Sequence, residues 1–91
     1  MEWHFLINTG KSILNFHAEV IFQTHVTQTI RVTVQDRTLV VENDFPYILS
    51  MKLKRKITWR RIAGKVGNVD VYLEVIDNLE DYVRKNSPRP R

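Results

Sequence analysis

The chain has 91 residues and a formal net charge of +4, and it contains no cysteine. A chain of this length suits one small domain without a deep interlobe cleft, and the lack of cysteine excludes disulfide bonds and thiolate zinc sites. Val, Ile, Leu and Phe make up about a third of the sequence, above the roughly 20% below which disorder is expected.

From Phe16 to about Ile62, apolar residues mostly alternate, as they do in β-strands, whereas residues 1–15 fit a strand or a helix. Trp3, Phe5 and Ile7 alternate along the first stretch. The stretch "SILNFHAEVIF" (12–22) could also form a helix, but β-branched and aromatic residues dominate it, so we predict a strand. The alternation is clearest in "VTQTIRVTVQ" (26–35), whose apolar residues share one face: Val26, Ile30, Val32 and Val34.

The middle of the chain continues this pattern. The polar segment "QDRT" (35–38) predicts a turn before the strand "LVVEN" (39–43), and "NDFP" (43–46) predicts a second connection. The next run, "YILSMKL" (47–53), alternates again, with Leu49, Met51 and Leu53 on one face. We therefore predict one more strand here.

A strongly basic segment follows at residues 51–65, with no acidic residue between Asp44 and Asp70. We predict a β-hairpin whose loop is "KRK" (54–56), so that Leu53 faces Ile57, and Trp59 lies in the core opposite Met51. The alternative is a basic amphipathic helix over 49–63, whose apolar stripe breaks at a charge. The hairpin exposes seven cationic side chains: Lys52, Lys54, Arg55, Lys56, Arg60, Arg61 and Lys65.

The end of the chain has a helical period. After "AGKVGN" (63–68), Asn68 can cap a helix and Asp70 suits its first turn. An apolar stripe then recurs every three or four residues, which predicts a helix over 69–85: Tyr72, Val75, Ile76, Leu79, Tyr82 and Val83. The last residues, 87–91, contain two prolines and predict a flexible basic tail.

These elements predict a single α+β domain over residues 1–86. It contains an antiparallel β-meander of about five strands, with one C-terminal amphipathic helix packed on one face. The expected core residues are Phe16, Val20, Phe22, Ile30, Val32, Val34, Leu39, Val41, Leu49, Met51, Leu53, Ile57, Trp59, Tyr72, Val75, Ile76, Leu79 and Val83.

Two glycine motifs are better explained as turns. "TGKS" (9–12) ends like a phosphate-binding loop, but Phe5 stands where that loop needs its first glycine. "GKVG" (64–67) resembles the Gly-x-x-Gly loop of KH-type RNA-binding domains, although in that family the loop joins two helices. Here a strand is expected before it, so we interpret the segment as a strand-to-helix turn.

No pattern in the sequence predicts catalysis, a metal or a cofactor. His17 and His25 could approach each other across a hairpin, but no third ligand follows at a fixed offset. The chain has no nucleophile elbow, and its paired acids lie on a solvated helix. We expect a non-enzymatic protein without a small-molecule substrate.

The charge asymmetry between the basic hairpin and the acidic helix allows three explanations. The hairpin docks an acidic protein surface or a second subunit, which we favour. Alternatively, it binds DNA or RNA through the phosphate backbone without sequence specificity. In the third explanation, the acids of the helix compensate the basic residues within one molecule.

The expected location is the cytoplasm. No apolar run is long enough to cross a membrane, and the amino terminus carries an acid where an export signal carries positive charge.

Overall fold

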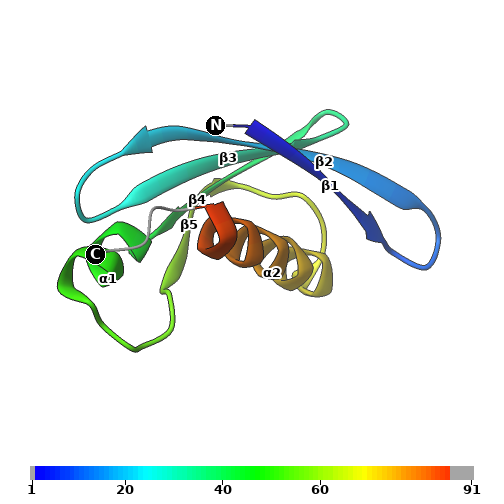
Figure 1. Ribbon diagram of the computed structural model, residues 1–91. Coiled ribbons are helices and arrows are strands. Elements are labelled where there is room, and N and C mark those ends of the chain that lie inside the picture. The colour runs from blue at the N-terminus through cyan, green and yellow to red at the C-terminus, as the bar shows by residue number, and fades with distance from the viewer. Residues whose placement is uncertain (1, 87–91) are drawn as a thin grey trace.

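Five antiparallel strands follow one another as a meander in the order β1-β2-β3-β4-β5. The computed structural model describes residues 2–86, and the predicted tail at 87–91 lies outside these residues. The elements are β1 (Glu2–Asn8), β2 (Ile13–Gln23), β3 (Gln28–Val34), β4 (Arg37–Asn43), α1 (Phe45–Met51), β5 (Trp59–Gly64) and α2 (Val69–Asn86) (Figure 1). This arrangement confirms the predicted α+β class.

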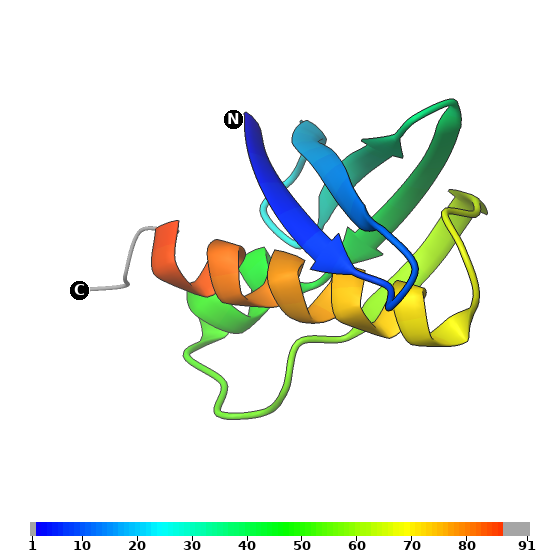
Figure 2. The same cartoon turned by 90° about the vertical axis from the view of Figure 1, so that its right-hand side faces the viewer.

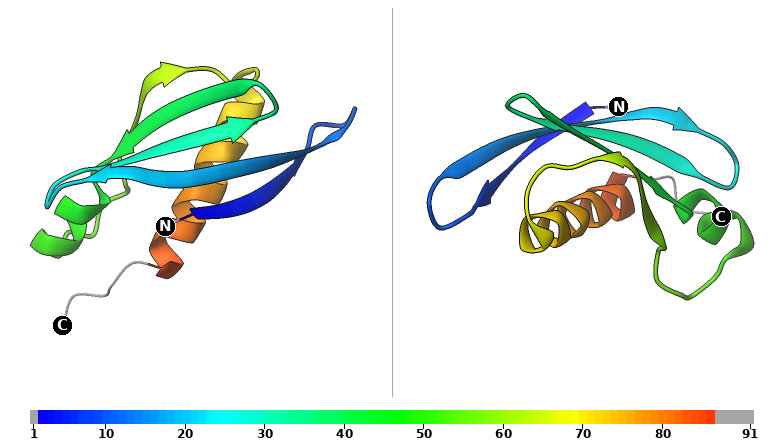
Figure 3. Two further views of the ribbon diagram at one scale, coloured as in Figure 1. Left: turned by 90° about the horizontal axis from the view of Figure 1, so that it is seen from above. Right: turned by 180° about the vertical axis from the view of Figure 1, so that it is seen from behind.

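One face of the sheet packs on α2, which crosses the strands steeply (Figures 2 and 3). The alternation in β3 buries Ile30, Val32 and Val34 on this face and leaves Arg31 exposed on the other. From the helix, the stripe residues Val75, Leu79 and Val83 are buried. The apolar side chains of the two layers therefore form one core, as the two periods in the sequence require.

The first segment is a strand, as predicted. Trp3 and Ile7 are buried, and the Trp3 indole stacks on the Tyr82 ring with 4.0 Å between ring centroids. Phe5 and Phe16, paired across β1 and β2, stack at 5.3 Å. Aromatic pairs thus hold β1 both to its neighbouring strand and to α2.

The core prediction is wrong for Phe22, whose side chain is 63% exposed. The register of β2 against β3 shifts between Val20 and Phe22, so Phe22 lies opposite Thr29 on the outer face. A bulge adds one residue to a strand, and each later side chain then changes face. Val26 lies beyond this strand, in the turn before β3, and is exposed.

The predicted strand over 47–53 is wrong, because Phe45–Met51 form the helix α1. The side-chain oxygen of Asn43 accepts the Phe45 N–H at 2.9 Å, and a proline stands in the first turn, where no N–H partner is needed. Phe45 and Ile48 face the core, whereas Met51 and Leu53 are exposed. Over so few residues, the apolar positions fit the two-residue spacing of a strand and the three- or four-residue spacing of a helix equally well.

The predicted hairpin over 51–65 is therefore also wrong, as is the alternative helix over 49–63. Residues 52–58 form an irregular connection, and β5 pairs with β4, with Asn43 opposite Trp59. The predicted inward direction of Trp59 and Ile57 is nevertheless confirmed. Ile57 is buried, and the half-buried Trp59 indole donates to Glu80 on α2 at 3.1 Å.

The predicted helix over 69–85 is confirmed as α2. The Asn68 side-chain oxygen accepts the Val71 N–H at 3.0 Å, as a capping residue should. The buried apolar residues that the core prediction missed are Trp3, Ile7, Ala18, Phe45, Ile48 and Val66. Trp3 and Ile7 lie in β1, Ala18 in β2, Phe45 and Ile48 in α1, and Val66 in the connection before α2.

Candidate functional site

The seven cations follow one edge of the molecule, although not on a hairpin. Lys52 ends α1, Lys54, Arg55 and Lys56 lie in the 52–58 connection, Arg60 and Arg61 lie on β5, and Lys65 lies between β5 and α2. All seven are exposed. β5 is the last strand of the sheet, and the segments directly before and after it carry the other five cations; we call the seven residues the basic edge.

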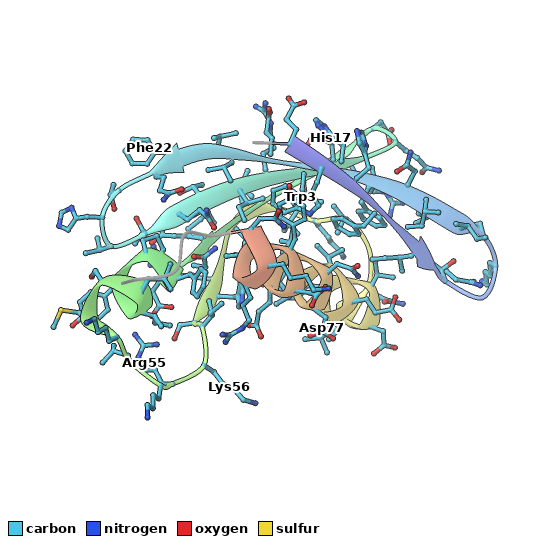
Figure 4. The ribbon with its side chains drawn as sticks, in the orientation of Figure 1. Trp3, His17, Phe22, Arg55, Lys56 and Asp77 are labelled. Atoms are coloured by element: carbon cyan, nitrogen blue, oxygen red, sulfur yellow. The ribbon has the colours of Figure 1, made fainter. Side chains whose placement is uncertain are left out.

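Two contacts with the rest of the fold fix the 52–58 connection. The Asp44 carboxylate accepts a hydrogen bond from the Arg55 guanidinium at 2.6 Å and another from the Thr58 N–H at 2.8 Å. Ile57 inserts into the core with 6% of its surface exposed. Lys56 therefore points outward from a connection that is held on both sides (Figure 4).

The Asp44 carboxylate has a lowered pKa. Partial burial acts to raise this pKa, but the hydrogen bond from the Thr58 N–H and the charge of Arg55 together outweigh it. The ionised form is therefore the one that holds the connection in place.

Acid is expected to release the 52–58 connection. Because the pKa of Asp44 is lower in the folded chain than in the unfolded chain, this stabilisation is complete above the unfolded value near pH 4 and is lost at lower pH. The Thr58 amide resonance, followed by NMR, should shift as the pH falls below about 4. Asp44→Asn should remove this dependence, and a Thr58 resonance that titrates unchanged in that variant would contradict the assignment.

The two arginines of β5 point to opposite faces of the sheet. Arg60 lies opposite Glu42 on the outer face and pairs with it at 3.2 Å. Arg61 lies opposite Val41, whose side chain is buried on the helix face. A register shift between Val40 and Val41 follows, so β5 is a bulged edge strand, which is a poor template for the addition of another strand.

The acids of α2 do not neutralise the basic edge. Within residues 2–86, Glu80 pairs with Arg84 and Asp81 with Lys85, both inside the helix. Asp77 points away from the sheet (Figure 4). Among the described residues, the basic edge forms only the pairs Arg55–Asp44 and Arg60–Glu42, so its other five cations have no acidic partner within 4.0 Å.

A hollow of about 450 Å³ lies beside the carboxyl end of β5, where the chain turns into α2. Its buried residues are Leu39 and Val66, and the half-buried Tyr72 adds an aromatic ring. Arg61 and Lys65 bring the basic edge to its border. The remaining lining residues are Gly67, Asn68 and Val69.

The wall of this hollow is tied to β4. The Lys65 N–H donates to the Thr38 carbonyl at 3.1 Å, and Val66 is 2% exposed. The sequence indicated the cations at this place but not the hollow. Its lining comes from β4, β5, the 65–68 connection and α2, and the packing of that connection between Leu39 and Tyr72 forms the hollow.

His17 and His25 do not approach each other across the β2–β3 hairpin. His17 stacks on His4 across β1 and β2, with 4.7 Å between ring centroids, and its Nε2 lies 3.7 Å from Glu2. His25 lies in the turn between β2 and β3. In the described part of the chain, no group of three His, Cys, Asp or Glu side chains could hold a metal ion.

Comparisons of the chain with protein-family models, with curated proteins and with solved structures find no match. Between Glu2 and Asn86, neither helix combines the length and the apolar character that crossing a membrane requires.

Proposed function

We propose that this protein is a non-catalytic binding module that docks an acidic protein surface through the basic edge. The observation that carries the proposal is the pattern of ion pairs on this edge. Five of its seven cations have no acidic partner within residues 2–86. Neighbouring like charges repel one another, and an acidic partner replaces that repulsion by attraction.

Internal compensation explains the basic edge less well. In that case the acids of α2 would approach the cations of β5 and of the 52–58 connection. Instead, Glu80 accepts the Trp59 indole N–H and pairs with Arg84. Among residues 2–86, the only acids that pair with the basic edge are Glu42 and Asp44, which lie at the end of β4 and just after it.

A protein partner fits the site better than a nucleic acid does. Modules that bind single-stranded nucleic acid stack bases on exposed aromatic rings beside their cations. On the basic edge, the Trp59 ring is half-buried and bonded to α2. The cations instead border an apolar hollow, which suits a protein side chain.

The non-catalytic part of the proposal rests on where the perturbed acids lie. Glu19 and Asp44 have lowered pKa values, and each is engaged by an arginine, Arg31 or Arg55. Neither lines the hollow beside β5 or the smaller hollow between the β1–β2 turn and the start of α2. A general acid usually needs a raised pKa inside a cleft. The cytoplasm remains the proposed location, and the cysteine-free composition agrees with it.

Reversing two unpaired cations is expected to weaken binding of an acidic peptide by about tenfold or more. The variant is Lys54→Glu with Lys56→Glu, and the probe is a short synthetic peptide in which Glu alternates with Val, titrated at low and moderate salt. Both lysines are exposed and take no part in the two ion pairs of the edge, so the fold should be unaffected.

The control of equal charge is Lys11→Glu with Lys85→Glu, in the turn after β1 and in the last turn of α2; both lysines are exposed, and the surface pair of Lys85 with Asp81 contributes at most about 1 kcal/mol. It should leave peptide affinity within about twofold. Equal loss in both variants would show that only net charge matters and would overturn the proposal.

Tighter binding of random-sequence DNA or RNA than of the peptide at the same salt would replace the proposal with the nucleic-acid alternative. Light scattering on the free protein tests whether a second copy is the acidic partner.

A further inference from the structure

We infer that the hollow beside β5 receives one apolar side chain of the acidic partner, so that the preferred ligand is an acidic extended segment with a single aromatic or branched anchor residue. This inference rests on the proposed function. It adds the chemical pattern of the partner, which the cations alone do not define.

The composition of the hollow is the first step. At about 450 Å³ it falls within the range of about 300–1,000 Å³ that is typical of ligand pockets. Leu39 and Val66 are buried beneath it, and the Tyr72 ring forms part of its lining. Such a surface offers dispersion contacts and the release of water to an apolar group.

The charges at its border are the second step. Arg61 and Lys65 line the hollow, are exposed, and have no acidic partner within 4.0 Å among residues 2–86. An apolar side chain bound there brings the residues before and after it next to these cations. Glu or Asp on either side of the anchor would then be attracted, which makes the partner both acidic and anchored.

The length of the basic edge is the third step. β5 runs for six residues, about 20 Å at the rise of a strand, from the 52–58 connection to the far side of the hollow, which Arg61 borders from within the strand and Lys65 from just beyond its end. An extended segment of about six residues spans this distance. One partner segment can therefore contact Lys56 at one end of β5 and fill the hollow at the other. The bulge in β5 means that these contacts are made by side chains rather than by strand addition.

The test compares two synthetic acidic peptides that differ only at one central position, which is Phe in one and Ala in the other. If the hollow receives the anchor, the Phe peptide should bind about tenfold more tightly or better, because a buried aromatic side chain gains that much from leaving water. NMR methyl resonances of Val66 and Val69 should shift more with the Phe peptide.

Two matched variants locate the effect. Val69→Trp adds bulk at the hollow, where Val69 is 70% exposed, and it should remove most of the Phe advantage. Leu73→Trp adds similar bulk one turn along α2, outside the lining, and should preserve the advantage. Both positions are exposed, so both variants should fold.

The outcomes separate this inference from the proposed function. Equal affinity for the two peptides, with loss of both in Lys54→Glu/Lys56→Glu, would overturn the anchor while keeping the acidic partner. A Phe advantage that survives in Val69→Trp and shifts no methyl of the hollow would also overturn it. Failure of both peptides to bind at low salt would overturn both proposals together.

Discussion

Replacing Gly64 with alanine is expected to lower the free energy of unfolding by more than about 3 kcal/mol. Gly64 ends β5 with φ +81°, a backbone conformation that residues with a Cβ rarely adopt. An added Cβ would overlap the carbonyl oxygen of Thr38 and lie 2.9 Å from its carbonyl carbon. Both obstacles belong to the backbone, so a side-chain rotation cannot relieve them.

Gly10→Ala is the matched control for this prediction. Gly10 has φ +87°, close to that of Gly64, but an added Cβ there would meet no atom within 4 Å. Its cost should be about 1 kcal/mol, the conformational part alone. Urea denaturation of the two variants therefore separates the conformational cost from the steric cost. Equal midpoints would show that β5 is not held as close to β4 as the structure places it.

The steric limit at Gly64 also concerns the site. The Lys65 N–H donates to Thr38, so the chain leaves the sheet at a fixed point and then forms the wall of the hollow. A Gly64→Ala variant that remains folded should have this wall displaced. The Phe advantage in peptide binding should then fall, whereas contact with Lys54 and Lys56 should persist.

The sheet and the long helix were predictable because their signals are local and long. In β3, residues 28–34 alternate without interruption between buried positions and positions that are half-buried or exposed. In α2, the apolar stripe runs through the whole helix, and Asn68 marks its start in the sequence. A pattern of this length fits either the period of a strand or that of a helix, but not both. Tertiary packing then stabilises the same element that the local pattern favours.

The segment from Phe45 to Leu53 could not be assigned from its pattern. Its apolar residues at positions 45, 48 and 49 suit a helix, and those at 49, 51 and 53 suit a strand. The structure is decided by packing of Phe45 and Ile48 against the core and by the hydrogen bond from the Phe45 N–H to Asn43. Phe22 shows the same limit, because a bulge cannot be recognised from alternation alone.

The candidate site was predictable only as a set of charges. The sequence predicts that the cations are exposed, and they are. Which of them are paired depends on acids distant in the chain, as in Arg60 with Glu42. The hollow depends on the bulge in β5 and on where α2 begins. Such sites arise from packing, so composition indicates the chemistry of a partner more readily than the place that anchors it.

Asn43→Ala is expected to lower the free energy of unfolding by about 3 kcal/mol. Asn43 is 2% exposed at the point where β4 ends and α1 begins. Its side-chain oxygen accepts the Phe45 N–H at 2.9 Å, and its side-chain nitrogen donates to Gln28 at 3.0 Å. Alanine would leave both partners unsatisfied in a buried place, and each such group costs about 1–3 kcal/mol.

Gln23→Ala provides the control within the same chain of amides. The Gln23 side-chain oxygen accepts a hydrogen bond from the Gln28 side chain at 3.1 Å, but Gln23 is exposed. Water can therefore take the place of the Gln23 side chain, and the loss in free energy of unfolding should stay below about 1 kcal/mol. Asn43→Asp separates the two bonds of Asn43, because a carboxylate still accepts the Phe45 N–H but cannot donate to Gln28. If the Asn43 side chain directs the chain into α1, Asn43→Asp should preserve the protection of the Ile48 N–H from hydrogen exchange. Asn43→Ala should lose that protection. If both variants lose stability but keep that protection, Asn43 only fills the core, and the turn into α1 depends on Phe45 and Ile48 instead.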